Sequence, residues 1–100
     1  MVKHVILWQF NEELSTEEKE QLKANIKERL EALVGVVPGL RDVTVETKPM
    51  ETSNADWLLD CTLDDEDALK GYAVHPAHVA VAKELILPNS KTRVCMDYEV

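Results

Sequence analysis

The sequence has few cysteines, little positive charge and no long apolar run. Only two of its 100 residues are cysteine, Cys61 and Cys95, and neither lies near another cysteine at metal-binding spacing. A disulfide scaffold is therefore excluded, and we expect both thiols to be reduced. No apolar run reaches the ~20 residues that a membrane-spanning helix needs. Because the first residues also lack the small-residue cleavage site of a signal peptide, we expect a cytoplasmic protein.

Positive charge is scarce, since 11 Lys and Arg residues stand against 19 Asp and Glu residues, for a formal net charge of −8. Such a surface repels nucleic-acid phosphates and anionic lipids, so we expect neither nucleic acid nor a membrane as a partner. The apolar fraction of 45% and the charged fraction of 30% are typical of globular proteins. A chain of this length carries one core, which predicts a single domain over residues 1–100.

Hydropathy patterns predict four strands and three helices. A capping-box pattern from Ser15 to Glu18 opens a long helix, whose buried stripe is expected to continue to Val37. The acidic residues 64–67 open a short second helix, because the helix dipole favours negative charge there. His75-Pro76 interrupts the chain and starts a third helix over residues 77–87. Alternation of apolar and polar residues predicts strands at residues 2–10, 40–48, 57–63 and 92–100.

This order of elements predicts an α+β fold of the ferredoxin-like type, a four-stranded antiparallel sheet with helices on one face. The first strand is apolar on both sides, so both sides of the sheet need cover. We expect His4, Ile6 and Trp8 to face the helices. These residues would then form the floor of any pocket between the sheet and the helices.

The opposite side of the first strand carries Val5 and Leu7, and Val43 and Val45 would add to it if they share that face. An exposed sheet face with such residues is an apolar patch that requires cover. A second copy of the chain, packed sheet to sheet, would provide it. We therefore expect a homodimer formed through the sheet face.

Two of the three histidines lie between Tyr72 and Val79. The spacing of His78 relative to Val81 and Leu85 places its ring on the stripe that packs against the sheet. Tyr72 lies just before the break, and His4 is expected on the helix-facing side of the first strand. The three polar side chains are therefore predicted to converge beneath the helices.

Three interpretations of this cluster are open. In the first, the rings are satisfied core groups, with His75 as a helix cap and His78 bonded to Tyr72 or to a backbone carbonyl. In the second, a neutral His takes a proton while the phenol hydrogen-bonds a developing enolate. In the third, His75 and His78 share a metal ion, but no third ligand is obvious and Asp97 is expected on the other face. We therefore predict no metal and no cofactor.

Several segments of the chain resemble the stress-responsive α/β-barrel domain family, abbreviated Dabb. They are MVKHVIL at residues 1–7, VPGL at 37–40, YAVHPAHV at 72–79 and the dipeptide Asp97-Tyr98, and the HPAHV string is the most specific. The resemblance covers nearly the whole chain. It implies a ferredoxin-like fold in which two sheets form a barrel across a dimer, with a pocket between the sheet and the helices of each subunit.

Plant polyketide cyclases of this family close a poly-β-keto thioester by aldol condensation, with a His of the HPAHV string as the base and a nearby Tyr holding the substrate carbonyl. The resemblance therefore implies catalytic roles for His78 and Tyr72. Ile26 and Trp57 stand where those cyclases carry a Tyr and another His, which makes the pocket more apolar. The residues expected around the pocket are His4, Ile6, Trp8, Ile26, Trp57 and His75.

The sequence thus predicts a small dimeric protein that binds an apolar or carbonyl-bearing molecule, with or without polyketide-cyclase-like proton transfer by His78. The alternative is a non-enzymatic stress-responsive or structural protein whose histidines serve stability. The volume of the pocket separates the two, because useful ligand sites measure roughly 300 Å³ or more, whereas a filled core holds little beyond a water molecule.

Overall fold

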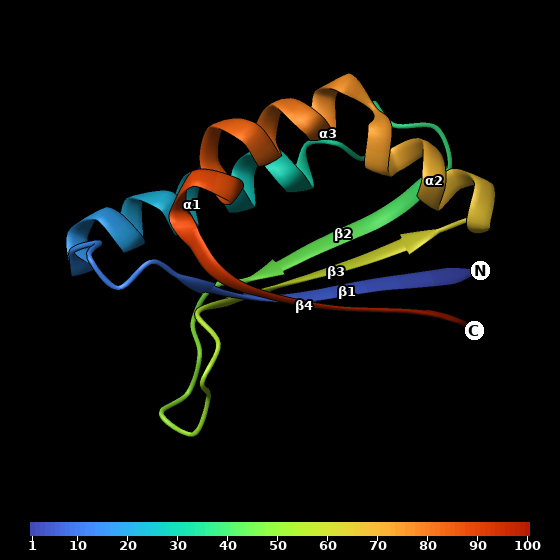
Figure 1. Ribbon diagram of the computed structural model, residues 1–100. Helices are drawn as coiled ribbons and strands as arrows, with labels where there is room; N and C mark the ends of the chain where they lie inside the picture. Colours follow the sequence, from blue (N-terminus) through green and yellow to red (C-terminus); the bar gives the residue numbers. More distant parts are fainter.

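The computed structural model describes residues 1–100 as a four-stranded antiparallel sheet with its helices on one face (Figure 1). The helices are α1 (Thr16–Glu31), α2 (Glu66–Val74) and α3 (Pro76–Val81). The strands are β1 (Val2–Phe10), β2 (Leu40–Glu46), β3 (Trp57–Leu63) and β4 (Ser90–Glu99), and they lie side by side in the order β2-β3-β1-β4. This is the ferredoxin-like α+β fold that the sequence predicts.

The helix α1 begins at the predicted capping box. The Ser15 hydroxyl accepts a hydrogen bond from the Glu18 amide, and the Glu18 carboxylate accepts one from the Ser15 amide. The helix ends at Glu31, so the expected continuation to Val37 is wrong. Residues 32–37 form turns instead, and Gly35 adopts a left-handed φ of 88° that does not continue an α-helix.

The third helix also departs from the sequence prediction. It starts at Pro76, where the His75 ring caps it by accepting a hydrogen bond from the Ala77 amide. After six residues it widens into a π-helical turn, η1 (Ala82–Ile86), in which the amide of Leu87 donates to the carbonyl of Ala82. A short 3₁₀ turn, η2 (Leu87–Asn89), then leads into β4.

The side chains of β1 alternate as predicted between a helix-facing side and an outer sheet face. His4, Ile6 and Trp8 are buried beneath the helices. Val43 and Val45 are only 6% and 0% exposed and belong to the helix-facing side, so they do not share the outer face and the condition under which they would add to it is not met. A register shift between Leu40 and Asp42 in the β2–β3 pairing sets which β2 residues face the helices.

The outer sheet face is apolar and uncovered. Leu7 of β1 lies between Leu58 of β3 and Val94 of β4, and Val5 pairs with Met96. Val94 is 58% exposed and Met96 is 65% exposed. We use the name outer sheet face for Val5, Leu7, Leu58, Val94, Met96 and Tyr98.

None of the helices has the length and the hydropathy that a membrane crossing requires.

Gly39, the residue before β2, lets α2 approach the sheet closely. Its φ of 79° is left-handed, and a Cβ built on it would lie 2.6 Å from the Cβ of Ala68 in α2. Only a glycine permits both the backbone conformation and this close approach. Because α2 also carries Tyr72, the contact between Gly39 and Ala68 helps to set the height of the phenol above the sheet.

We expect Gly39→Ala to lower the free energy of unfolding by about 2 to 5 kcal/mol, since a left-handed Ala costs ~1–2 kcal/mol and overpacking a further ~1–3 kcal/mol. Gly35→Ala is the matched control, because its φ is similarly left-handed while nothing lies within 4 Å of the added Cβ. Gly35→Ala should lose only the ~1–2 kcal/mol that a left-handed Ala costs. Urea denaturation measures both values, and equal losses would show that the contact with Ala68 is not tight.

Candidate functional site

A cavity of about 210 Å³ lies between the sheet and the helices. Its wall is mostly apolar, with side chains that include Ile6 and Trp8 from β1 and Ile86 from η1. The polar groups that reach it are His4, Tyr72, His78 and Arg93. A mostly apolar cavity with a small number of polar groups is typical of a small-molecule site.

Three separate parts of the chain bring these polar groups together. His4 points up from β1, Tyr72 comes from α2 and His78 from α3. The ring centroids of Tyr72 and His78 are 4.2 Å apart, and those of Tyr72 and His4 are 5.8 Å apart in an edge-on arrangement. The break at His75-Pro76 lets the chain turn between the two helices, so that both place a ring over the same cavity.

Tyr72 is almost fully buried, and its phenol remains protonated. Burial raises the pKa of Tyr72 far above its ordinary value, because the phenolate would lose its hydration. The thiol of Cys61, 4.0 Å away, donates to the phenol oxygen. The proton of the phenol is therefore free to be donated to a bound molecule.

His78 has the properties of a neutral base. Burial lowers the pKa of His78, while the nearby carbonyl of Ala73 opposes this shift and the charges of His4, Arg93 and His75 add to it. Its Nδ1 atom is buried and has no hydrogen-bond partner. A neutral imidazole with an unpaired ring nitrogen can accept a proton near pH 7.

Three residues expected around the pocket do not line this cavity. Ile26 is fully buried in the core on α1, and His75 serves as the cap of α3. Trp57 stacks face to face on Trp8, with ring centroids 4.0 Å apart and planes 9° from parallel. Trp57 therefore supports the wall that Trp8 forms, without reaching the cavity itself.

Sequence reasoning missed Arg93, which lines the cavity from β4. Arg93 pairs directly with Trp8, and paired residues of neighbouring strands point to the same side of a sheet. The alternation of β4 alone could not have revealed this, because both sides of the strand are exposed and give no hydropathy signal. Only the register with β1 assigns Arg93 to the helix-facing side.

Asp97 also lies on the helix-facing side, so the prediction that it points to the other face is wrong. It pairs directly with His4, and its carboxylate is hydrogen-bonded to His4 Nδ1. The Sγ atom of Cys95 lies 3.8 Å from the same nitrogen and 3.6 Å from the Asp97 carboxylate. His4 therefore joins the cavity to a second polar group at the edge of the sheet.

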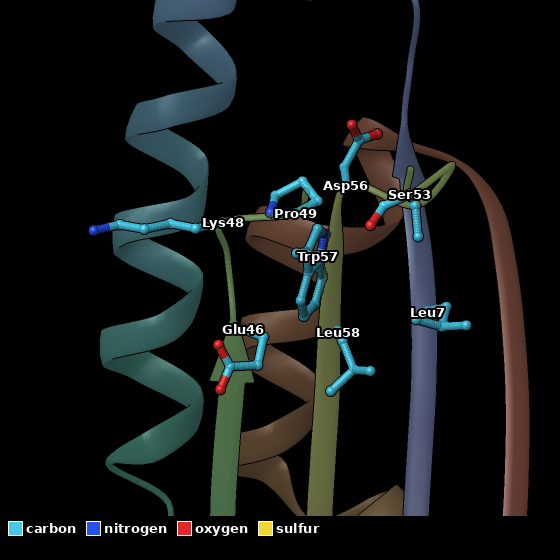
Figure 2. A pocket seen from close by; sticks show the side chains of 9 residues that line it. Leu7, Glu46, Lys48, Pro49, Ser53, Asp56, Trp57 and Leu58 are labelled. Atoms are coloured by element: carbon cyan, nitrogen blue, oxygen red, sulfur yellow. The ribbon is translucent and has the colours of Figure 1, made fainter. Parts of the chain in front are cut away.

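A second hollow of about 190 Å³ lies where the β2–β3 connection meets the sheet. Figure 2 shows Leu7 and Leu58 on neighbouring strands, with Ser53 and Asp56 near one end and the Lys48 side chain directed away. The Asp56 carboxylate accepts a hydrogen bond from the amide of Phe10, which is a structural role. This hollow is continuous with the outer sheet face and holds no histidine or cysteine.

Comparison with known proteins supports the same fold. The family model for the stress responsive A/B barrel domain matches residues 2–100. A dimeric protein of unknown function with a ferredoxin-like fold from Bacteroides fragilis is 31% identical with a TM-score of 0.92, and the match covers 99% of this chain and 95% of that chain. No curated protein has a detectably similar sequence.

More distant structures share the fold alone. A Dabb family protein with a ferredoxin-like fold from Mesorhizobium loti is 16% identical with a TM-score of 0.77, covering 99% of this chain and 95% of that one. The hydroxynitrile lyase of Passiflora edulis is 17% identical with a TM-score of 0.74, covering 97% and 90% of the two chains.

The lowered pKa of His78 predicts that this residue makes the fold less stable in acid. In the unfolded chain the imidazole titrates near pH 6.5, whereas the folded protein binds that proton only at lower pH. Stability should therefore fall as the pH drops below about 6.5 and stop falling, for this residue, below the folded pKa. We expect His78→Gln to show a smaller loss of melting temperature between about pH 7.5 and about pH 5 than the wild type.

Lys83→Gln, which changes an exposed residue of the adjoining η1 turn, is the control for that measurement. It should keep the pH dependence of the wild type, since Lys does not titrate in this range. An unchanged pH dependence in His78→Gln would mean that the ring is hydrated and titrates as in the unfolded chain.

Proposed function

The chain belongs to the stress responsive A/B barrel domain family, and we propose that it is a homodimer in which each subunit binds a small carbonyl compound and moves a proton on it. The observation that carries this proposal is the pairing of two complementary groups over one apolar cavity. His78 offers an unpaired ring nitrogen, and Tyr72 offers a phenol proton. A base and a hydrogen-bond donor beside one cavity can together bind a carbonyl compound and transfer a proton on it.

The dimer is proposed to form through the outer sheet face. Its apolar side chains are too exposed for an isolated subunit, and a second sheet packed against them would bury them. The connection between β2 and β3 projects from the sheet on this same side, away from the helices (Figure 1). The Bacteroides fragilis protein, which is 31% identical, is described as dimeric.

The volume of the cavity indicates the size of the ligand. At about 210 Å³ the cavity falls below the roughly 300 Å³ expected of a useful ligand site, but it is larger than the space for one water molecule that a filled core leaves. A long poly-β-keto chain is therefore a poor candidate. We propose a short-chain carbonyl compound, held by apolar contacts and oriented by a hydrogen bond from Tyr72.

The proposed chemistry is the reversible removal of a proton from the carbon beside a carbonyl group. The neutral imidazole of His78 accepts this proton while the carbonyl becomes an enolate. The phenol of Tyr72 donates a hydrogen bond to the enolate oxygen, and the charge of Arg93 favours the negative charge that develops. His78 then returns the proton to carbon, so that the base is regenerated.

We propose that the protein acts in the cytoplasm. Both cysteines are free, with Cys61 buried and Cys95 exposed. An exposed free thiol is typical of a reducing compartment.

Met96→Glu should convert the dimer into a monomer, because a carboxylate at the centre of a sheet-to-sheet interface would be buried without a partner. Val36→Glu is the matched control, since Val36 is an exposed apolar residue outside the outer sheet face. Sedimentation velocity at micromolar concentration measures both. A wild-type protein that sediments at 11.3 kDa, the mass of one chain, would contradict the proposed interface.

The proton transfer is tested with a short thioester, acetoacetyl-N-acetylcysteamine, by following deuterium exchange at its α-carbon by NMR. We expect the wild-type protein to exceed the exchange rate of buffer alone. His78→Gln should lower that excess by about 10²-fold or more, the usual contribution of a general base. Tyr72→Phe should lower it by about 10²-fold, as the loss of one oxyanion donor does.

Two controls keep this experiment specific. His75→Asn retains a good helix cap while removing a histidine outside the cavity, and Tyr98→Phe removes a phenol on the outer sheet face. Both should keep the wild-type rate. If the wild-type protein neither binds nor exchanges the thioester, the polar rings serve stability, and the non-enzymatic alternative replaces the proposal.

A further inference from the structure

Three chemically different metal-binding side chains meet at the β1–β4 edge of the sheet. His4 lies on β1, directly opposite Asp97 on β4, and Cys95 precedes Asp97 by two residues on the same side of the strand. One donor atom from each residue lies within 4.8 Å of the other two. We call these three residues the edge cluster.

We propose that the edge cluster binds one Zn²⁺ ion through Cys95 Sγ, His4 Nδ1 and an Asp97 carboxylate oxygen. A tetrahedral zinc ion with ordinary bond lengths holds its ligand atoms about 3.5 Å apart. The sulfur lies 3.8 Å from the imidazole nitrogen and 3.6 Å from the carboxylate oxygen, close to that spacing. The two distances that involve the thiol sulfur therefore match the spacing of ligand atoms around zinc.

The third distance, between the His4 Nδ1 atom and the Asp97 carboxylate oxygen, is shorter because a hydrogen bond joins these two side chains. A zinc ion would replace the proton that they share, and the carboxylate would move outward to make room. The Asp97 side chain is 41% exposed and free to make that movement, whereas His4 is 7% exposed and fixed by the core. One rigid ligand and two adaptable ones allow the ion to set the final geometry.

The donor set favours zinc over the hard cations. A thiolate and an imidazole are poor ligands for Mg²⁺ and Ca²⁺, which prefer oxygen atoms only. Three protein ligands leave the fourth position of a tetrahedral ion to water or to a bound molecule. Because His4 belongs both to the edge cluster and to the wall of the cavity, the ion would lie at the border of the cavity.

The same residues do not form a cysteine nucleophile with its base. In such a triad the carboxylate holds one nitrogen of the imidazole and the thiol contacts the other, whereas Cys95 and Asp97 here contact the same Nδ1 atom. Burial and the neighbouring Asp97 charge raise the pKa of Cys95, which disfavours the free thiolate. A bound cation would reverse that electrostatic effect and deprotonate the thiol.

The edge cluster is accessible in the proposed dimer. Cys95 and Asp97 are both exposed. They point to the helix-facing side, while the proposed interface uses the outer sheet face. Zinc binding therefore does not require the proposed dimer to open.

The test uses the full chain in a non-thiol reductant, titrated first with Co²⁺ and then with Zn²⁺. We expect one Co²⁺ per chain with a thiolate-to-cobalt charge-transfer absorption band, which Zn²⁺ then displaces. Cys95→Ser should abolish this band. Asp97→Asn should weaken zinc binding, measured by calorimetry, by at least the ~10–100-fold that loss of an outer-shell partner already costs.

Glu99→Gln is the matched control for Asp97→Asn, because Glu99 is an exposed carboxylate two residues further along β4. It should bind zinc with wild-type affinity. Equal weakening in both variants would show diffuse attraction to acidic side chains, and a thiolate band that persists in Cys95→Ser would place the metal at Cys61. Either result, or a wild-type protein without the band, overturns the proposal. All substitutions are at exposed positions, and circular dichroism verifies that each variant is folded.

Discussion

The position of β1 between β3 and β4 determines which functional groups of this protein can meet. The register of the two pairings places Cys61, His4 and Asp97 in one row across the sheet, all on the helix-facing side. Cys61 contacts the phenol of Tyr72 at one end of the row, and Asp97 holds the imidazole of His4 at the other. A slip of one residue in β1 would turn His4 to the outer sheet face and separate all these groups.

The helices supply the remaining polar groups of the cavity. Gly39 allows α2 to approach the sheet closely, and the His75-Pro76 break redirects the chain so that Tyr72 and His78 lie over the same hollow. The two rings owe their contrasting acid–base properties to one cause. Burial favours the neutral form of each group, so the phenol keeps its proton and the imidazole lacks one.

The parts of the structure that burial controls could be predicted from the sequence. The alternation in β1 identified His4, Ile6 and Trp8 as helix-facing because one side of that strand is covered, and the capping box marked the start of α1. The spacing of His78 relative to Val81 and Leu85 predicted that its ring points toward the sheet, and the structure places it there beside Tyr72. These signals depend on local chemistry that a single segment carries.

Features that depend on how one strand is aligned with its neighbour could not be predicted in this way. Both sides of β4 are exposed, so its hydropathy does not say that Arg93, Cys95 and Asp97 face the helices. In β2, the orientation of Val43 and Val45 follows a register shift between Leu40 and Asp42, and the sequence of β2 does not indicate this shift. The edge cluster was invisible for the same reason, since it exists only when β4 is aligned with β1.

The π-helical turn η1 brings both of its ends to the same cavity. In an α-helix, residues five apart differ by about 140° in direction. The wider turn instead allows Ala82 and Leu87, joined by its long hydrogen bond, to border the same cavity. Such a turn holds one more residue than α-helical winding needs. Loss of one residue there would restore α-helical winding and turn Ala82 and Leu87 away from each other, which would reshape the cavity and leave the sheet unchanged.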